Sequence, residues 1–538
     1  MLNEITVCGT PEGYDAKIIL DELNKKHNSV IHVARDDKRM RAMSDAIEFF
    51  SPEIEVFTFP SWDCLPYDRV SPNLEISSAR MAVLSKFAEN TDRNFIVLTT
   101  LNAVLQKVPS KSDVQGYNFK AEVGRNINER RLREFLLRMG FTKSSTVREA
   151  GEYAIRGGII DIFPPGYTNP VRLDLFGAIL DGARLFDPET QLTIKKLNEI
   201  ELAPVSEVVL DEISIKNFRQ AYRSQFGASF ANDPLYESVS AGRKYQGLEH
   251  WLPFFYMELD TFFSYVPSAT ITMDHKLATD IISRCNLVAD QYEARNFANK
   301  NKPTKDYAYK PVKPSELYLD ENDWKTILKN RRSLVFHSLP QALGPNIVDV
   351  GGRIGRNFTP ERQSDNFHLF SSLADHIKDR LNFGPVLIAS YSEGSMERLS
   401  GLIEDEGLQK PVIVSDWSGI SQHILYLSVW PLDQGFETSD LTVISEQDIL
   451  GDRLIRRPKK RRPENFLTDT QELNIGGLVV HIDHGIGRYI GLEVLTVGGA
   501  AHECLLIEYA ESSRLYLPVE NIDSVSYTHL RAHETFGY

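Results

Sequence analysis

Short apolar runs alternate with helical segments along the first 115 residues. Four of these runs have the length and composition of buried strands: Ile5–Cys8, Val30–Ala34, Glu55–Phe59 and Phe95–Thr100. Apolar residues recur at helical spacing between them. Alternation of this kind predicts a parallel sheet covered by helices.

The turn after the first run stands where such a sheet would carry a nucleotide-binding loop. A P-loop needs Lys and Ser or Thr after its last glycine, to reach the terminal phosphates and to hold Mg²⁺. Here Gly13 is followed by Tyr14 and Asp15, and Gly-Lys-Ser/Thr occurs nowhere in the chain. Because Asp15 would repel phosphate, we expect an α/β domain without nucleotide and a chain that is not itself an enzyme.

Charge and cysteine content narrow the class of protein further. Sixty Lys and Arg against 74 Asp and Glu give a net charge of -14, which argues against a protein held on DNA by a globally basic surface. The four cysteines are far apart and have no CxxC spacing, so we expect a reducing, cytoplasmic location without zinc or disulfides. We find no signal-peptide pattern and no apolar run long enough to span a membrane.

Catalytic and metal motifs are weak. The chain has no GxSxG and no HExxH. His481 and His484 have a spacing that metal ligands use, but without further close ligands we expect turn or core histidines. Asp161 and Asp174 each lie in an apolar run and predict strands with one polar face.

Three further segments follow the first. A small α+β unit begins after a polar boundary at 109–124, with a helix over Arg130–Met139 and strands over Gly158–Phe163, Val171–Phe176 and Ala183–Phe186. Residues 205–345 are more helical and aromatic. A third α/β stretch over 365–450 predicts a helix at Ser395–Glu406, capped by Ser395, and four strands: Pro385–Ser390, Pro411–Asp416, Ile424–Trp430 and Leu441–Ser445.

The sharpest change of composition falls at 451–463, where seven of thirteen residues are basic and two are proline. The segment predicts a tether between domains, although its basic residues would also suit DNA phosphates: Arg456, Arg457, Lys459, Lys460, Arg461 and Arg462. Beyond it, apolar runs with closely spaced glycines over 475–525 indicate a small barrel-like β module.

Several motifs resemble one known family. Gly151–Pro164 and Pro170–Phe176 resemble a pattern shared by the excision-repair protein UvrB and the transcription-repair-coupling factors, known as Mfd. Phe59–Asp68 and Gly247–Phe255 look like the coupling-factor version of two further motifs. Val479–Tyr489 is similar to the RNA-polymerase-interacting domain of those factors, which is related to CarD-type regulators.

The resemblance covers about residues 1–526 and implies a multidomain α/β protein. It implies a degenerate RecA/P-loop-type domain 1a at 1–116, a UvrA-binding domain at 117–205 and domain 1b at 206–345. Domain 3 would follow at 350–450, a basic linker at 451–470 and a small CarD/Tudor-like barrel that binds polymerase at 471–526. The residues from 527 to 538 leave the pattern, and we expect a foreign tail without function.

The implied function is recruitment: binding UvrA and stalled RNA polymerase in bacterial transcription-coupled excision repair. The family's ATP-driven DNA translocase, with its ATP, Mg²⁺ and main DNA contacts, would lie in motor domains beyond this chain. Two alternatives are an ATP-dependent translocase and a UvrB-like damage-recognition subunit, and the missing P-loop argues against both.

The resemblance also points to site residues. Arg156, Arg172 and Phe176 match the family's UvrA-binding surface, and arginines beside an aromatic ring are typical of interface hot spots. The alternative is solvated arginines on a sheet with a core phenylalanine. Leu492, Val494 and Leu495 would reach polymerase, with Leu495 contacting the β subunit by edge-strand pairing, unless these three are ordinary barrel core.

Overall fold

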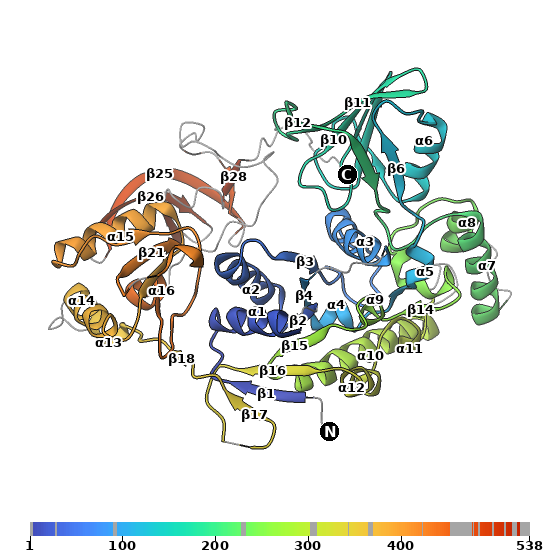
Figure 1. The fold of residues 1–538 in the computed structure, drawn as a ribbon. Coiled ribbons are helices and arrows are strands. Elements are labelled where there is room, and N and C mark those ends of the chain that lie inside the picture. The colour runs from blue at the N-terminus through green and yellow to red at the C-terminus, as the bar shows by residue number, and fades with distance from the viewer. Residues whose placement is uncertain are drawn as a thin grey trace. The chain divides into compact units, whose positions relative to one another are not determined.

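The computed structural model describes most of the chain in two compact units, Met1–Gly451 and Asp452–Tyr538 (Figure 1). In the first unit, the described residues are 4–26, 29–89, 94–227, 233–301, 309–342, 344–363, 369–421 and 423–451. In the second unit, they are 476, 478–481, 485–497, 500–509, 513–518 and 525–527.

A seven-stranded sheet organises the N-terminal part, in the order β17-β1-β16-β15-β2-β4-β3. Every neighbouring pair is parallel, as the alternating pattern predicts. The strands are β1 (Glu4–Cys8), β2 (Val30–Ala34), β3 (Glu55–Phe59), β4 (Phe95–Thr100), β15 (Thr270–Asp274), β16 (Ser333–His337) and β17 (Ile347–Asp349). Because β15 and β16 lie within it, residues 1–116 and 206–345 share one sheet.

Helices cover both faces of this sheet, because successive strand residues point to opposite sides. Val30 packs into one core with α1 (Tyr14–Lys26) and α2 (Asp37–Phe50). Ile31 packs into the other core with α3 (Leu74–Ala88). The helices α4 (Leu101–Val104), α9 (Phe262–Tyr265), α10 (Leu277–Asn301) and α12 (Glu321–Lys329) also contribute to that second core.

An inserted α+β domain carries a six-stranded sheet in the order β12-β11-β10-β9-β8-β7. Its strands are β7 (Thr142–Lys143), β8 (Glu152–Arg156), β9 (Ile159–Ile162), β10 (Val171–Phe176), β11 (Ile179–Phe186) and β12 (Thr193–Leu197). Helix α6 (Glu129–Arg138), capped by Asn128, packs Leu132 and Leu136 into this domain's core. A short ribbon of β6 (Phe119–Glu122) and β13 (Glu199–Leu202) completes the domain.

Aromatic side chains dominate the helical segment that follows. Phe218 and Tyr222 of α7 (Glu212–Phe226) pack with α8 (Pro234–Ser240) and the 3₁₀ helix η1 (Leu248–Phe254). The short elements nearby are α5 (Lys111–Val114), α11 (Pro314–Leu317) and the pair β5 (Val108–Pro109) and β14 (Leu259–Asp260).

A second, smaller α/β sheet has the order β18-β22-β23-β19-β21-β20. Its strands are β18 (Arg353–Ile354), β19 (Val386–Ser390), β20 (Val412–Ile413), β21 (Leu425–Val429), β22 (Phe436–Glu437) and β23 (Thr442–Ser445), with η2 (Trp417–Gly419) between β20 and β21. The covering helices are α13 (Thr359–Arg362), α14 (Leu369–Arg380), α15 (Glu393–Asp405) and α16 (Glu446–Leu450).

Two sequence predictions in this second sheet were inaccurate. Helix α15 begins at Glu393, and its cap is Ser392 rather than Ser395, because the Ser392 hydroxyl accepts from the Ser395 backbone N–H at 3.3 Å. The strand expected over Pro411–Asp416 is shorter in the structure and is limited to β20. The apolar residues Val412 and Ile413 suggested a longer buried strand, but both are exposed.

The second unit is a five-stranded antiparallel sheet in the order β27-β26-β25-β24-β28. Its strands are β24 (Leu478–His481), β25 (Gly485–Val497), β26 (Ala500–Glu508), β27 (Arg514–Pro518) and β28 (Val525–Tyr527). Within the described strands, no pairing joins β27 to β28, so closure into a barrel stays a prediction. Tyr527 pairs with Val479, so the first residue assigned to the foreign tail belongs to a strand.

In the part of the chain that the structure describes, no helix is long and apolar enough to cross a membrane.

Candidate functional site

The predicted UvrA-binding residues lie on one face of the six-stranded sheet, opposite the face that α6 covers. Strand register sets this face, because cross-strand neighbours share a side of the sheet. Arg172 lies between Asp161 and Arg184, and Ile159 lies between Arg156 and Asp174. We call this the outer face: Arg156, Ile159, Asp161, Arg172, Asp174, Phe176, Ile179 and Arg184.

Two tight hairpins put an apolar tip on the outer face. Gly157 and Gly177 begin these turns with φ of 61° and 62°, where a side chain would be strained. Phe176 and Ile179 pair directly across the second turn. Phe176 is 79% exposed, and Ile159 and Ile179 are each about two-fifths exposed. Phe176 is therefore a surface side chain, and its interpretation as core is wrong.

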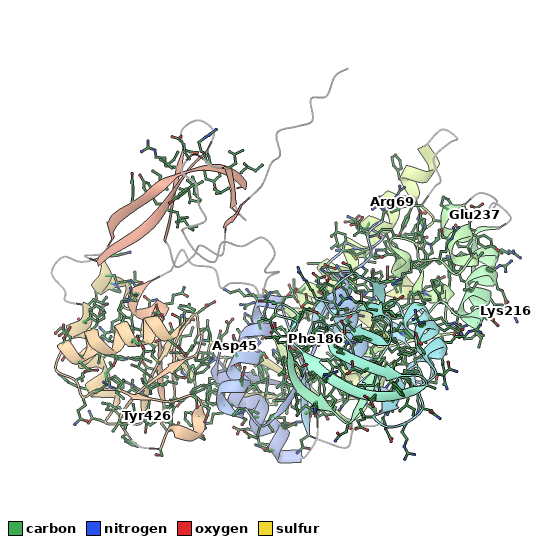
Figure 2. The ribbon with its side chains drawn as sticks, turned by 90° about the horizontal axis from the view of Figure 1, so that it is seen from above. Asp45, Arg69, Phe186, Lys216, Glu237 and Tyr426 are labelled. Carbon is green, nitrogen blue, oxygen red and sulfur yellow. The ribbon has the colours of Figure 1, made fainter. Side chains whose placement is uncertain are left out.

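Arg172 is paired within the chain. Its Nε and Nη2 donate to the two carboxylate oxygens of Asp161 at 2.7 and 3.0 Å, and its guanidinium lies 4.4 Å from the centre of the Phe186 ring, which Figure 2 labels. These hydrogen bonds raise the pKa of Arg172. The prediction that Arg172 binds UvrA stays a prediction, and the structure adds that its charge already stabilises Asp161.

Arg156 is the more available cation of the predicted pair. Its side chain is 52% exposed, and its guanidinium approaches Asp161 only to 3.9 Å while donating to the Ser145 carbonyl. Since Asp161 is nearly buried and already bonded to Arg172, one carboxylate serves two arginines. The outer face thus combines an exposed cation with an exposed aromatic side chain.

Sequence reasoning did not single out three contributors to this face: Ile159, Ile179 and Arg184. It assigned Asp161 and Asp174 only to polar strand faces, and Asp174 forms an ion pair with Arg184. Each of the two isoleucines directly follows a two-residue turn that contains glycine. This glycine-containing turn between two strands is the pattern that could have predicted their position at a hairpin tip.

The predicted polymerase-binding residues Leu492, Val494 and Leu495 all lie in β25. Leu495 is opposite His502 of β26. On the other side, β24 pairs only with the first four residues of β25, from Gly485 to Arg488. Among the described residues, the later part of β25 therefore has one strand neighbour, as strand addition by a partner requires.

The six basic residues proposed for DNA contact, from Arg456 to Arg462, and His484 lie outside the described residues. His481 lies in β24. Across the described ranges, no cluster of three or more metal-ligating side chains occurs.

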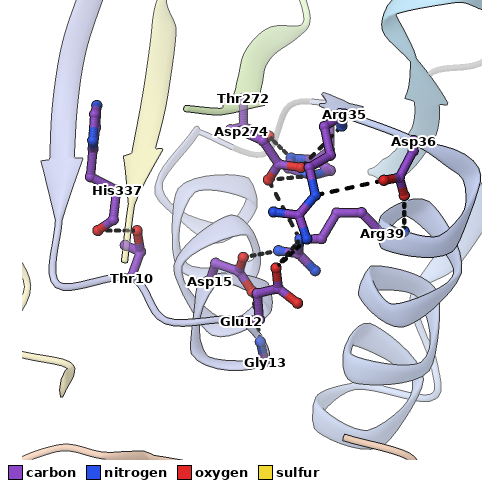
Figure 3. A network of polar contacts seen from close by, with 11 residues as sticks. Thr10, Glu12, Gly13, Asp15, Arg35, Asp36, Arg39, Thr272, Asp274 and His337 are labelled. Atoms are coloured by element: carbon purple, nitrogen blue, oxygen red, sulfur yellow. Dashed lines mark hydrogen bonds and ion pairs between the residues drawn. The ribbon is translucent and has the colours of Figure 1, made fainter. Parts of the chain in front are cut away.

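An internal ion network fills the position where a P-loop sheet would hold phosphate (Figure 3). Arg39, whose side chain is 2% exposed, donates to Asp15 and lies 3.6 Å from Asp274 and 3.8 Å from Glu12. Asp15 also accepts from the Gly13 N–H at 3.0 Å. Burial raises the pKa of Asp15 to about 7, although Arg39 opposes the rise. Carboxylates thus occupy the place where a P-loop presents lysine and free N–H groups.

A buried cluster ties the inserted domain to the first sheet. Arg80 of α3 is fully buried and donates from Nε and Nη2 to Glu207 at 3.1 and 2.9 Å, and from Nη1 to the Pro60 carbonyl at 2.9 Å. The Trp62 indole donates to the same carboxylate at 2.9 Å. Glu207 follows the inserted domain directly, so this cluster anchors the point where the chain leaves that domain.

Three known domain families match segments of this chain. The UvrB interaction domain matches residues 119–207, the MFD, D3 domain matches 382–449, and the CarD-like/TRCF RID domain matches 473–528. The first match contains the outer face, and the third contains all strands of the second unit.

Curated relatives extend the similarity along nearly the whole chain. Transcription-repair-coupling factors of Haemophilus influenzae, Rickettsia bellii and Escherichia coli are 30%, 29% and 29% identical to it, over 96%, 93% and 97% of its length. The chain spans less than half of each relative, 44%, 44% and 45% in the same order.

The fold and the domain matches define a multidomain α/β protein that combines a UvrB-type interaction domain with a CarD-like module. The curated relatives that match nearly the whole chain are transcription-repair-coupling factors, and the resemblance predicted from the motifs is confirmed.

Proposed function

We propose that this chain is a recruitment scaffold in transcription-coupled nucleotide-excision repair, which binds UvrA through the outer face and RNA polymerase through the second unit. The exposed tip of Phe176, Ile159 and Ile179 beside Arg156 carries the first half of the proposal. An aromatic ring that is 79% exposed on a rigid hairpin is costly to leave in water and suits a partner's apolar socket. The guanidinium of Arg156 would pair with an acidic group at the rim.

For polymerase, we propose that the later part of β25 adds to a strand of the β subunit. Its single strand neighbour among the described residues leaves backbone N–H and C=O groups available on the other side. We assign Leu495 to the centre of this contact, with Leu492 and Val494 beside it.

The remaining assignments are part of the same proposal. We assign the parallel sheet to a degenerate RecA-type domain in two segments, the second sheet to domain 3 and the second unit to a small barrel, in a cytoplasmic protein. We assign no ATPase activity to this chain: ATP, Mg²⁺ and most DNA contacts would act in the motor of longer relatives. A UvrB-like damage-recognition subunit is the alternative, and the carboxylates around Arg39 argue against it.

A bridging experiment tests this function. RNA polymerase is immobilised, and purified UvrA is added with and without the chain. We expect UvrA to be retained only when the chain is present. Retention of the chain without UvrA, or of neither protein, would contradict the scaffold role.

A further inference from the structure

A basic strip is formed by α6 and the short end strand β7 of the inserted domain. These two elements hold five basic residues, Arg130, Arg131, Arg133, Arg138 and Lys143, against two acidic residues, Glu129 and Glu134. This excess of positive charge stands in a chain whose net charge is -14.

Part of this charge is neutralised within the helix and part is not. Arg130 pairs with Glu134 at 3.1 Å, and Arg133 pairs with Glu129. Arg131 and Arg138 are seven residues apart, which places them two turns apart on one side of α6. Both are exposed, as is Lys143 of β7. Among the described residues, none of these three has an ion-pair partner.

The strip has a definite place in the fold. Leu132 and Leu136 pack α6 against the core of the sheet, beside which α6 lies in Figure 1. The exposed arginines Arg131 and Arg138 therefore face away from that core. The strand β7 is an end strand of the sheet, and the loop after it accepts a hydrogen bond from Arg156 at the Ser145 carbonyl. The strip therefore comprises the helix on the face opposite the outer face and one end strand of the sheet, and it shares no residue with the outer face.

We propose that α6 and β7 bind the phosphate backbone of duplex DNA, as a site separate from those for UvrA and polymerase. The ten residues of α6 span about 15 Å, and a duplex carries one charge per about 1.7 Å of its axis, so the strip faces several phosphates. It carries no aromatic anchor, and its one exposed leucine, Leu137, is isolated. Cations without an apolar centre suit sequence-independent phosphate contacts better than a protein interface.

The test is the salt dependence of DNA binding by the full chain. Binding of a fluorescein-labelled duplex is followed by anisotropy over a KCl series for the parent and for Arg131→Gln/Arg138→Gln. The matched control is Lys195→Gln/Lys196→Gln, which removes two exposed charges from β12 at the opposite edge of the same sheet. Circular dichroism checks that all three proteins fold.

We expect the α6 variant to bind several-fold more weakly at low salt. Its slope of log K against log salt should be shallower by about 2, one unit for each lost phosphate contact, while the control keeps the parent slope. The proposal is overturned if the parent does not bind duplex at low salt, or if both variants have the same slope. It is also overturned if the α6 variant loses UvrA binding and keeps its DNA slope, because the strip would then serve an acidic protein partner.

Discussion

Arg172 of β10 and Asp161 of β9 lie opposite each other and form a bidentate ion pair, with nitrogen–oxygen distances of 2.7 and 3.0 Å. The Asp161 side chain is 2% exposed and that of Arg172 is 21% exposed. Of the two side chains, only that of Arg172 therefore reaches the surface. An arginine held in this way offers its remaining edge to a partner, while its charge already stabilises a buried carboxylate.

This pairing predicts different consequences for the two arginines of the outer face. Arg172→Ala leaves Asp161 buried with only the distant Arg156 guanidinium at 3.9 Å, and should lower the local stability of β9 and β10 by about 2–3 kcal/mol. Arg156→Ala removes an exposed cation and should change stability by less than about 1 kcal/mol. Hydrogen exchange of the β9 and β10 amides measures both effects. Equal protection in the two variants would contradict the structural role of Arg172.

His32 predicts how stability depends on pH. It is fully buried, its Nδ1 lies 3.0 Å from the Thr272 hydroxyl, and burial lowers its pKa to about 4. The unfolded state, with a His32 pKa of about 6.5, then binds more protons, so the contribution of His32 to stability falls as pH decreases from about 6.5 towards 4, by up to about 3 kcal/mol. The raised pKa of Asp15 contributes with the opposite sign over this range, so the effect of His32 is measured as a difference between parent and variant.

The comparison that isolates this contribution is His32→Gln. Over the same pH range, the melting temperature of the variant should fall less steeply than that of the parent. Parallel curves for the two proteins would show that His32 does not titrate as the structure requires.

The network around Arg39 predicts that the chain does not bind ATP at micromolar concentration. A triphosphate placed at this edge would meet Glu12, Asp15 and Asp274 instead of a P-loop lysine. Isothermal titration calorimetry with MgATP should give no saturable heat. A saturable isotherm that Arg39→Ala abolishes would contradict the account.

The proposed strand contact with polymerase predicts that Leu495→Arg weakens polymerase binding by the second unit. A charge placed in a water-excluding strand contact costs several kcal/mol, so polymerase binding should fall by well over tenfold. Leu495→Met is the conservative control and should bind like the parent. Pull-down with polymerase is compared with circular dichroism, and unchanged binding by a folded arginine variant would remove Leu495 from the contact.

Four of the seven strands of the parallel sheet, β1 to β4, were predicted almost to the residue from their short apolar runs. The other three, β15, β16 and β17, were not predicted, because residues 205–345 were interpreted only as helical and aromatic and β17 begins just after them. Val30–Ala34 has every residue buried and was predicted without error. The strand β12 was not predicted, since Thr193–Leu197 mixes apolar and basic residues and the first four of its five residues are exposed. In short edge strands such as β20, the side chains are exposed, so the sequence does not show where the strand begins and ends.

The candidate site was only partly predictable for a related reason. Arg156, Arg172 and Phe176 followed from a family motif, and their common face follows from strand register. The bond between Arg172 and Asp161 depends on which residues the hairpins bring opposite each other, and no local pattern encodes it. The Arg80–Glu207 pair joins residues 127 positions apart, so only the assembled fold shows it.

Binding of UvrA by Phe176→Ala tests the central claim most directly. The ring is 79% exposed, so its loss should leave folding intact, and Phe297→Ala, at a phenylalanine that is 69% exposed on α10, is the matched control. We predict that Phe176→Ala weakens binding measured by calorimetry by about 2 kcal/mol, roughly thirtyfold, while the control binds like the parent. Equal affinities of the parent and a folded Phe176→Ala variant would show that the outer face does not bind UvrA.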